Sequence, residues 1–207
     1  MDTFHIGFVI GPRINAGGRV ATPYDSLATL LHTGQKQHDK LQELEDLNTH
    51  RKSLQDDAIK DAKSQIDPAQ NILVAYSEDY HEGIVGIVAG RITEQHNKPS
   101  LILYVNPDTN TASGSLRAPS YFSIIDMLHH ESIAPLLLRS GGHQQAGGLT
   151  IETKNIQTLI DALQIYADSI ITPDMLEKEI TVDTVITPDD LTVNHILDIT
   201  KLAPFGE

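Results

Sequence analysis

The chain has 207 residues, 40% of them hydrophobic, with a formal net charge of −13 and no cysteine. This negative charge argues against a protein that coats nucleic acid through a broad basic surface, although a small basic site inside a cleft is compatible with it. No apolar run reaches the roughly 20 residues that span a bilayer, and the lack of cysteine excludes disulfides and fits a reducing compartment. We therefore expect a cytoplasmic protein with a packed core and no membrane association.

A stretch rich in glycine and arginine occupies residues 11–19. Arg13 and Arg19 flank Asn15 there, and a guanidinium beside permissive glycine backbone suits contact with a phosphate. The alternative is a loop whose arginines are merely solvated, and the stretch alone favours that alternative.

Residues 35–66 contain no Gly or Pro, and their apolar residues recur at steps of three and four or multiples of these. This pattern predicts one amphipathic helix of about 30 residues, roughly 45 Å long. We interpret its charged face, which includes Arg51, as solvated. A helix of this length suggests a connector between lobes, with segments at 1–34, 35–67 and 68–207. A shorter helix is expected before it, with Thr22 as N-cap and Pro23 as its first residue.

The chain from residue 68 onward alternates between strands and helices. Apolar runs at 72–76 and 101–105 flank a helix at 83–96, which predicts a right-handed parallel βαβ unit. Further elements are expected in this order: a polar strand at 111–117, a short helix capped by Ser123, a strand at 148–152, a helix at 155–171, an alternating strand at 179–186 and a helix at 189–202. The predicted fold is α/β, a long connecting helix followed by a mixed β-sheet flanked by helices.

Three polar positions accompany these elements. Ser115 and Arg117 are two residues apart, so they share one face of a strand. The sequence Gly141-Gly142-His143 predicts a turn that could offer backbone N–H groups and an imidazole to a small anion; read alone, a surface turn with a solvated histidine is favoured. Together these residues predict a pocket for a terminal phosphate. His81, between a strand and a helix, is a further candidate, with helix capping or a core role as the alternative.

No complete catalytic set is recognisable. The acidic residues lie on helix faces and turns, and the adjacent His129 and His130 are interpreted as solvated or as interacting with a helix C-terminus. We therefore expect no metal ligands in this chain, and His143 is the one residue for which a catalytic role is considered.

Five motifs occur in an order that resembles RecJ-type exonucleases of the DHH phosphodiesterase superfamily. They are Gly-Pro-Arg-Ile-Asn-Ala-Gly-Gly-Arg (11–19), Ser-Glu-Asp-Tyr-His-Glu-Gly-Ile-Val-Gly-Ile-Val-Ala-Gly-Arg (77–91), Gly-Ser-Leu-Arg (114–117), Gly-Gly-His-Gln-Gln-Ala-Gly-Gly-Leu (141–149) and Leu-Ala-Pro-Phe-Gly (202–206). Tyr80 stands where the family commonly has tryptophan, and Ala118 where it commonly has serine. The resemblance covers essentially the whole chain.

The resemblance implies the substrate-binding part of a 5′→3′ exonuclease for single-stranded DNA, acting in DNA repair and recombination. The chain would comprise the end of a DHH domain, the connecting helix and the DHH-associated domain, and would be inactive alone. A manganese or magnesium ion would bind to ligands outside this chain, and the full enzyme could have single-strand-binding or helicase partners.

The same resemblance implies roles for individual residues. Ser115 and Arg117 would hold the 5′-phosphate, and residues 141–143 would contact the phosphate near the scissile bond. Arg13, Asn15 and Arg19 would lie near the cleft between lobes.

Two other functions remain open at this point. One is a DHH phosphodiesterase for short oligonucleotides or cyclic dinucleotides, since such proteins share the Gly-Gly-His turn. The other is a non-catalytic nucleic-acid-binding or scaffold module, which the net charge would suit.

Overall fold

The computed structural model describes residues 2–177, 182 and 184–203. In chain order the elements are η1 (His5–Ile10), α1 (Gly11–Val20), α2 (Pro23–Leu31), α3 (Gln35–Gln65), β1 (Leu73–Ser77), α4 (Val85–His96), β2 (Ser100–Asn106), β3 (Thr111–Arg117), α5 (Ile124–Leu128), η2 (Ala134–Leu136), β4 (Leu137–Gly142), β5 (Ala146–Glu152), η3 (Thr153–Asn155), α6 (Ile156–Ile170), η4 (Pro173–Leu176), η5 (Pro188–Asp190) and α7 (Val193–Thr200).

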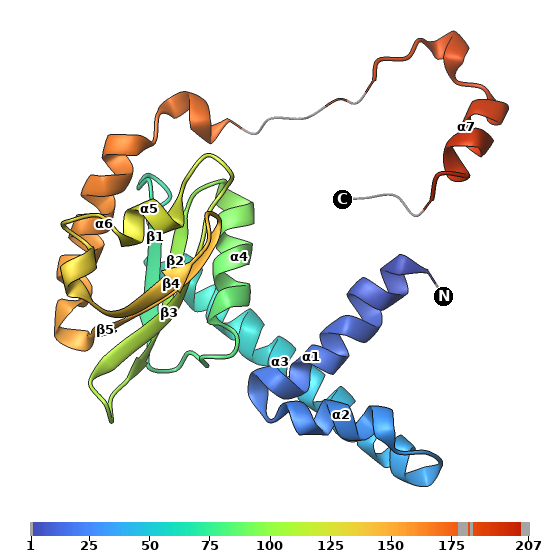
Figure 1. Cartoon of the computed structure of the whole chain (residues 1–207), viewed down its shortest axis with the longest axis horizontal. Helices are drawn as coiled ribbons and strands as arrows, with labels where there is room; N and C mark the ends of the chain where they lie inside the picture. Colours follow the sequence, from blue (N-terminus) through green and yellow to red (C-terminus); the bar gives the residue numbers. More distant parts are fainter. Residues whose placement is uncertain (1, 178–181, 183, 204–207) are drawn as a thin grey trace.

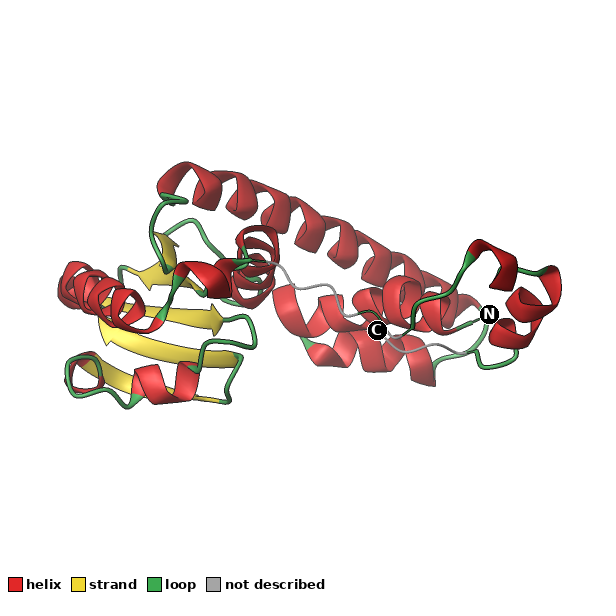
Figure 2. Ribbon diagram, turned by 90° about the horizontal axis from the view of Figure 1, so that it is seen from above, coloured by secondary structure: helices red, strands yellow, loops and turns green. Residues whose placement is uncertain are grey.

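The N-terminal helices and the long helix α3 form a helical arm that extends away from the sheet (Figure 2). Helix α3 runs unbroken over 31 residues, as its apolar spacing predicts. Thr22 caps α2 by accepting a hydrogen bond from the backbone of Tyr24, and Pro23 is the first residue of that helix. Gly34, with φ of +63°, reverses the chain between α2 and α3.

The glycine-rich stretch at residues 11–19 is helical, so the loop expected from its composition is wrong. Its glycines allow helices to pack closely instead of giving the backbone freedom. Gly17 is buried, and a Cβ atom added to it would lie 2.6 Å from Ser26 Oγ and 2.9 Å from the carbonyl oxygen of Thr22. Helix α1 therefore packs against α2 at a distance that only glycine permits.

A five-stranded mixed sheet follows the arm, with the strand order β1-β2-β3-β5-β4. Strands β1 and β2 are parallel and connected through α4, as predicted, and the remaining neighbours are antiparallel. Strand β4 was not expected from the sequence, which predicts only a turn at residues 141–143. Gly141 and Gly142 are its last two residues, and the turn itself is restricted to residues 143–145.

Helices cover the two faces of the sheet unequally (Figure 1). Helices α5 and α6 cover one face, and Leu116, Phe122 and Leu163 are among the residues of the core beneath them. Helices α3 and α4 cover the other face over β1, β2 and part of β3, and Leu73 and Ile102 belong to a second core there. On that second face, the half formed by β3, β5 and β4 carries Ser, Thr and Gly in place of apolar side chains.

The strand expected at 179–186 lies partly outside the described residues, and residues 182 and 184–187 form no strand. The last predicted helix is present but shorter, as η5 and α7, and the described residues from 184 to 203 are all exposed. Within the described parts of the chain, no helix combines the length and apolar character needed to cross a membrane.

Gly83 is the position at which the helical arm meets the loop before α4. A Cβ atom added there would lie 1.8 Å from the carbonyl oxygen of Arg19. We expect Gly83→Ala to lower the free energy of unfolding by about 1–3 kcal/mol or more, because the added Cβ atom would clash with the backbone of Arg19, which cannot simply turn aside. Thermal or urea denaturation measures this.

Gly90 on α4 provides the matched control, since a Cβ atom added there meets nothing within 4 Å. Gly90→Ala should be neutral or stabilise by up to about 1 kcal/mol. Equal melting of the Gly83→Ala variant and the wild type would show that this contact does not join the arm to the sheet.

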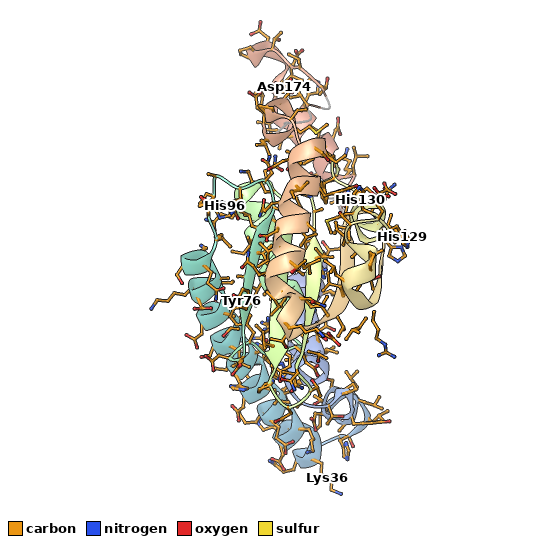
Figure 3. The ribbon with its side chains drawn as sticks, turned by 90° about the vertical axis from the view of Figure 1, so that its left-hand side faces the viewer. Lys36, Tyr76, His96, His129, His130 and Asp174 are labelled. Atoms are coloured by element: carbon orange, nitrogen blue, oxygen red, sulfur yellow. The ribbon has the colours of Figure 1, made fainter. Side chains whose placement is uncertain are left out.

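His96, at the end of α4 (Figure 3), has a buried Nε2 atom without a hydrogen-bond partner in the described structure. Burial lowers its pKa, and the positive charges of Lys63 and Lys98 lower it further. The unfolded chain therefore takes up a proton below pH of about 6.5 before the folded chain does, so acidification should destabilise the fold. We expect His96→Gln to lose less stability than the wild type between pH 7 and 5. The exposed His38→Gln should behave as the wild type does.

Candidate phosphate-binding site

Ser115 and Arg117 project from β3 toward the first turn of α4, on the shared face that their spacing predicts. A Cβ atom added to Gly86 of α4 would lie 3.1 Å from Arg117 Nη2 and 3.2 Å from Ser115 Oγ. Gly86 therefore leaves just enough room for both side chains between β3 and α4. The hydroxyl and the guanidinium lie side by side against one helix.

Arg117 is partly buried, and its Nη1 donates a hydrogen bond of 2.7 Å to the carbonyl oxygen of Leu116. Burial lowers the pKa of Arg117, and the positive charge of Arg19 lowers it further. Arg19 reaches this region from the end of α1, where its Nη1 donates a 3.1 Å hydrogen bond to the carbonyl oxygen of Gly83. The arm and the sheet thus each contribute an arginine.

Arg51 of α3 is a third cation in this region, and the sequence analysis wrongly placed it on a solvated face. It is only 8% exposed and donates hydrogen bonds to Gln55 Oε1 (2.9 Å) and Asn48 Oδ1 (3.2 Å). Its Nε atom is buried without a partner in the described structure. Burial and then the charge of Arg19 lower its pKa, against a weaker opposing effect of Asp56. Residues 44, 48, 51, 55, 58 and 62 follow one helical stripe, and this spacing could have revealed the burial of Arg51.

We call Arg19, Arg51 and Arg117 the basic cluster. None of them forms an ion pair with a carboxylate of the described residues. Their known hydrogen bonds go to uncharged oxygen atoms. Mutually repelling cations in a partly buried place are costly unless an anion joins them. The cluster is therefore suited to an anionic group.

The turn at residues 143–145 is exposed but held by backbone hydrogen bonds. The N–H of His143 donates to Ala146 O at 2.7 Å, while Gln145 O and Gln144 O accept from Ala118 (3.0 Å) and Ile124 (2.8 Å). The side chains of residues 143–145 make no hydrogen bond within the described structure. A rigid turn thus presents an imidazole and two amides to solvent.

Sheet register places this turn near Ser115. Ser115 pairs with Gly148, and Gly148 pairs with Gly141 on its other side. At about 4.8 Å per strand, Ser115 and Gly141 are about 10 Å apart across the sheet. A Cβ atom added to Gly141 would meet nothing within 4 Å, so its backbone is open to a ligand.

The other residues that the sequence suggested for the site lie outside the basic cluster or have other partners. Arg13 forms an ion pair with Glu45, through Nε to Oε2 at 2.6 Å and Nη2 to Oε1 at 2.9 Å, and so joins α1 to α3. Asn15 is exposed and lines a hollow of about 630 Å³ with Arg19 and Gly83. His81 Nδ1 accepts a 3.0 Å hydrogen bond from the backbone of Gly83, in the loop before α4.

The described residues contain no group of three or more His, Asp or Glu side chains that could hold a metal ion. The residues at hand thus do not fit a catalytic metal centre, while their cations and hydroxyls fit an anion.

Gly86 allows the geometry of this site to be tested directly. We expect Gly86→Val to displace the Arg117 guanidinium, because the added carbons would occupy its space, while the fold persists. The Nε–H resonance of Arg117 in 15N–1H spectra should shift. Gly90→Val, one helical turn away in open space, should leave it in place. An unchanged resonance in Gly86→Val would contradict the packing of Arg117 against α4.

Comparison with known proteins gives three findings. Residues 69–168 match the DHHA1 domain family. The single-stranded-DNA-specific exonuclease RecJ of Bacillus subtilis is 28% identical over 207 residues, covering 97% of this chain and 26% of that protein. RecJ of Escherichia coli is 26% identical, covering 98% of this chain and 37% of that protein. The chain therefore spans between about a quarter and somewhat more than a third of the length of these relatives.

The structural comparison agrees. Crystal structures of RecJ from Thermus thermophilus in complex with Mg2+ and with Mn2+ both superpose with a TM-score of 0.85. They are 27% and 26% identical, and each match covers 99% of this chain and 32% and 30% of the respective RecJ chain. The predicted fold, a connecting helix followed by a mixed sheet flanked by helices, is confirmed. Residues 69–168 are thus similar to the DHHA1 domain family, and nearly the whole chain is similar in sequence and fold to RecJ proteins.

Proposed function

We propose that this chain is the substrate-binding part of a RecJ-like exonuclease and holds the 5′-phosphorylated end of single-stranded DNA. The observation that carries the proposal is the basic cluster. Three arginines without carboxylate partners among the described residues gather in a chain whose net charge is −13. Such a concentration of positive charge against the overall charge marks a local anion site.

The chemistry of each group supports this ligand. Arg117 can donate a pair of hydrogen bonds to phosphate oxygens, and Ser115 beside it can donate a third. Arg19 adds charge from the arm, so a bound phosphate would contact both parts of the molecule. Partial burial reduces screening by solvent and strengthens each of these interactions.

The turn at residues 143–145 lies where the bound DNA strand would continue from its 5′ end. With the 5′-phosphate at Ser115 and Arg117, the next phosphate would reach the open backbone of Gly141 and the imidazole of His143, with Gly142 between them. These groups would orient the strand, and no proton transfer in this chain is needed for that role. Asn15 borders the same region, whereas Arg13 is engaged with Glu45.

Bond cleavage itself is proposed to depend on divalent metal ions whose ligands lie outside this chain. Relatives of known structure contain Mg2+ or Mn2+. A role in DNA repair and recombination, with other DNA-processing proteins as partners, belongs to the same proposal.

The proposal predicts selectivity for the 5′ end. The chain should bind 5′-phosphorylated single strands at least about tenfold more tightly than 5′-hydroxyl strands, since charged hydrogen bonds contribute about 1.5–3 kcal/mol. Arg117→Ala should abolish this ratio. Lys36→Ala, which removes the same charge at the far end of α3 (Figure 3), should preserve it. Fluorescence anisotropy at fixed salt measures both ratios.

Two outcomes would contradict the proposal. Equal affinity of the wild type for both strand ends would remove the phosphate site. Robust manganese-dependent degradation of DNA by these 207 residues would show that the metal ligands do not lie elsewhere.

A further inference from the structure

A groove of about 560 Å³ lies beside this site on the polar half of the sheet. Its lining includes Ser115, which connects it to the phosphate site, but its other side chains have no role in phosphate binding as described above. The residues used below are Glu82, Val85, Ser113, Arg139, Gly148 and Thr150.

Register arranges the floor of the groove in two rows. Ser115 and Gly148 form one row across β3 and β5, which continues to Gly141 of β4 beyond the groove lining. Ser113, Thr150 and Arg139 form the next row. Residues paired directly across strands share a face, and the rows are about 7 Å apart because each strand residue advances about 3.4 Å. The second row therefore begins about one nucleotide length from the phosphate site.

The second row offers hydrogen-bonding groups of both kinds. Ser113 Oγ and Thr150 Oγ1 lie 2.9 Å apart, so one donates to the other. One hydroxyl proton and several lone pairs are then left for a ligand. Arg139 makes no hydrogen bond or ion pair through its side chain within the described structure, so its donors are also available.

Charge indicates what kind of ligand fits. Glu82 faces the groove from the loop before α4, and it balances the positive charge of Arg139. A second phosphate would gain little from such a balanced pair, whereas an uncharged heterocycle with donors and acceptors would be satisfied by it. Val85 supplies an apolar wall, and Gly148 leaves the floor low and flat.

We infer that this groove receives the base of the 5′-terminal nucleotide, with its edge against Ser113, Thr150 and Arg139. The inference rests on the proposed function, because the phosphate at Ser115 and Arg117 places the nucleoside over the groove. Any of the four bases carries both donors and acceptors, so the groove tolerates sequence while requiring a base.

The experiment separates the base from the phosphate. Two 5′-phosphorylated single strands are compared, one intact and one abasic at its first nucleotide. The wild-type chain should bind the intact strand about tenfold more tightly, since a hydrogen bond to a charged group contributes about 1.5–3 kcal/mol. A strand that is abasic at an internal position several nucleotides away should bind like the intact one.

Three variants test whether the preference for the intact strand arises from this groove. Thr150→Val and Arg139→Ala should each reduce the ratio of intact to abasic affinity, and Gly148→Ala should nearly abolish it by raising the floor. A Cβ atom at Gly148 meets only Gly114 O, at 3.4 Å, so this variant should keep its fold. All three should keep the preference for 5′-phosphate, and Lys36→Ala should keep both preferences.

The preference for an intact first nucleotide and the preference for a 5′-phosphate can be lost independently of each other. Equal binding of intact and abasic strands by the wild type, with the phosphate preference present, would overturn the inference and leave the proposed function intact. An intact-to-abasic ratio that is unaltered in Gly148→Ala would overturn the inference in the same way. Loss of the phosphate preference in the wild type would overturn both.

Discussion

The contact between Arg19 and Gly83 joins the two parts of this molecule. The backbone of one residue approaches the other so closely that no Cβ atom fits, and the Arg19 guanidinium bonds the Gly83 carbonyl group. This approach fixes where α1 ends relative to the start of α4. It also determines that the Arg19 charge falls beside Arg117 of the sheet and Arg51 of the long helix. The basic cluster exists because the arm and the sheet meet at this glycine.

The second constraint is the unequal covering of the sheet. Helix α4 and the long helix bury the apolar half of one face, and that burial supplies the core that holds the sheet against the arm. In the polar half, α4 covers only part of β3. The small side chains of this half leave both the phosphate site and the neighbouring groove accessible, so the fold devotes one half of a single surface to stability and the other half to ligand contact.

Sequence periodicity was sufficient to predict the elements that are stabilised by local interactions or that carry a long repeating pattern of apolar residues. Helix α3, the parallel βαβ unit and the Thr22 cap were predictable, as was the shared face of Ser115 and Arg117. The helical state of residues 11–19 was not, because the close packing of Gly17 on Ser26 is a tertiary contact between elements that no composition rule includes. Strand β4 escaped for a related reason, since two glycines and an arginine become a strand only when β5 pairs with them.

The phosphate-binding site was also only partly predictable from the sequence. Motif spacing brought Ser115, Arg117 and the glycine turn into consideration, but it could not say that Arg13 is occupied by Glu45. Arg51 was overlooked because its neighbours along the chain are charged, whereas its neighbours along the helical stripe are buried. Which arginine is free and which is paired depends on the packing of α1 on α3, and that follows from the fold as a whole.

One consequence follows from repulsion within the basic cluster. Without a bound anion, three like charges lie close together, and their Coulomb repulsion lowers the stability of the fold. A bound anion removes this penalty and links the arm to the sheet through one shared ligand, so occupancy stiffens the junction as well as filling the site. Dissolved salt relieves the same penalty by screening while it competes for the same arginines. Ionic strength therefore acts on this molecule in opposite directions: it steadies the unliganded form and weakens the liganded one.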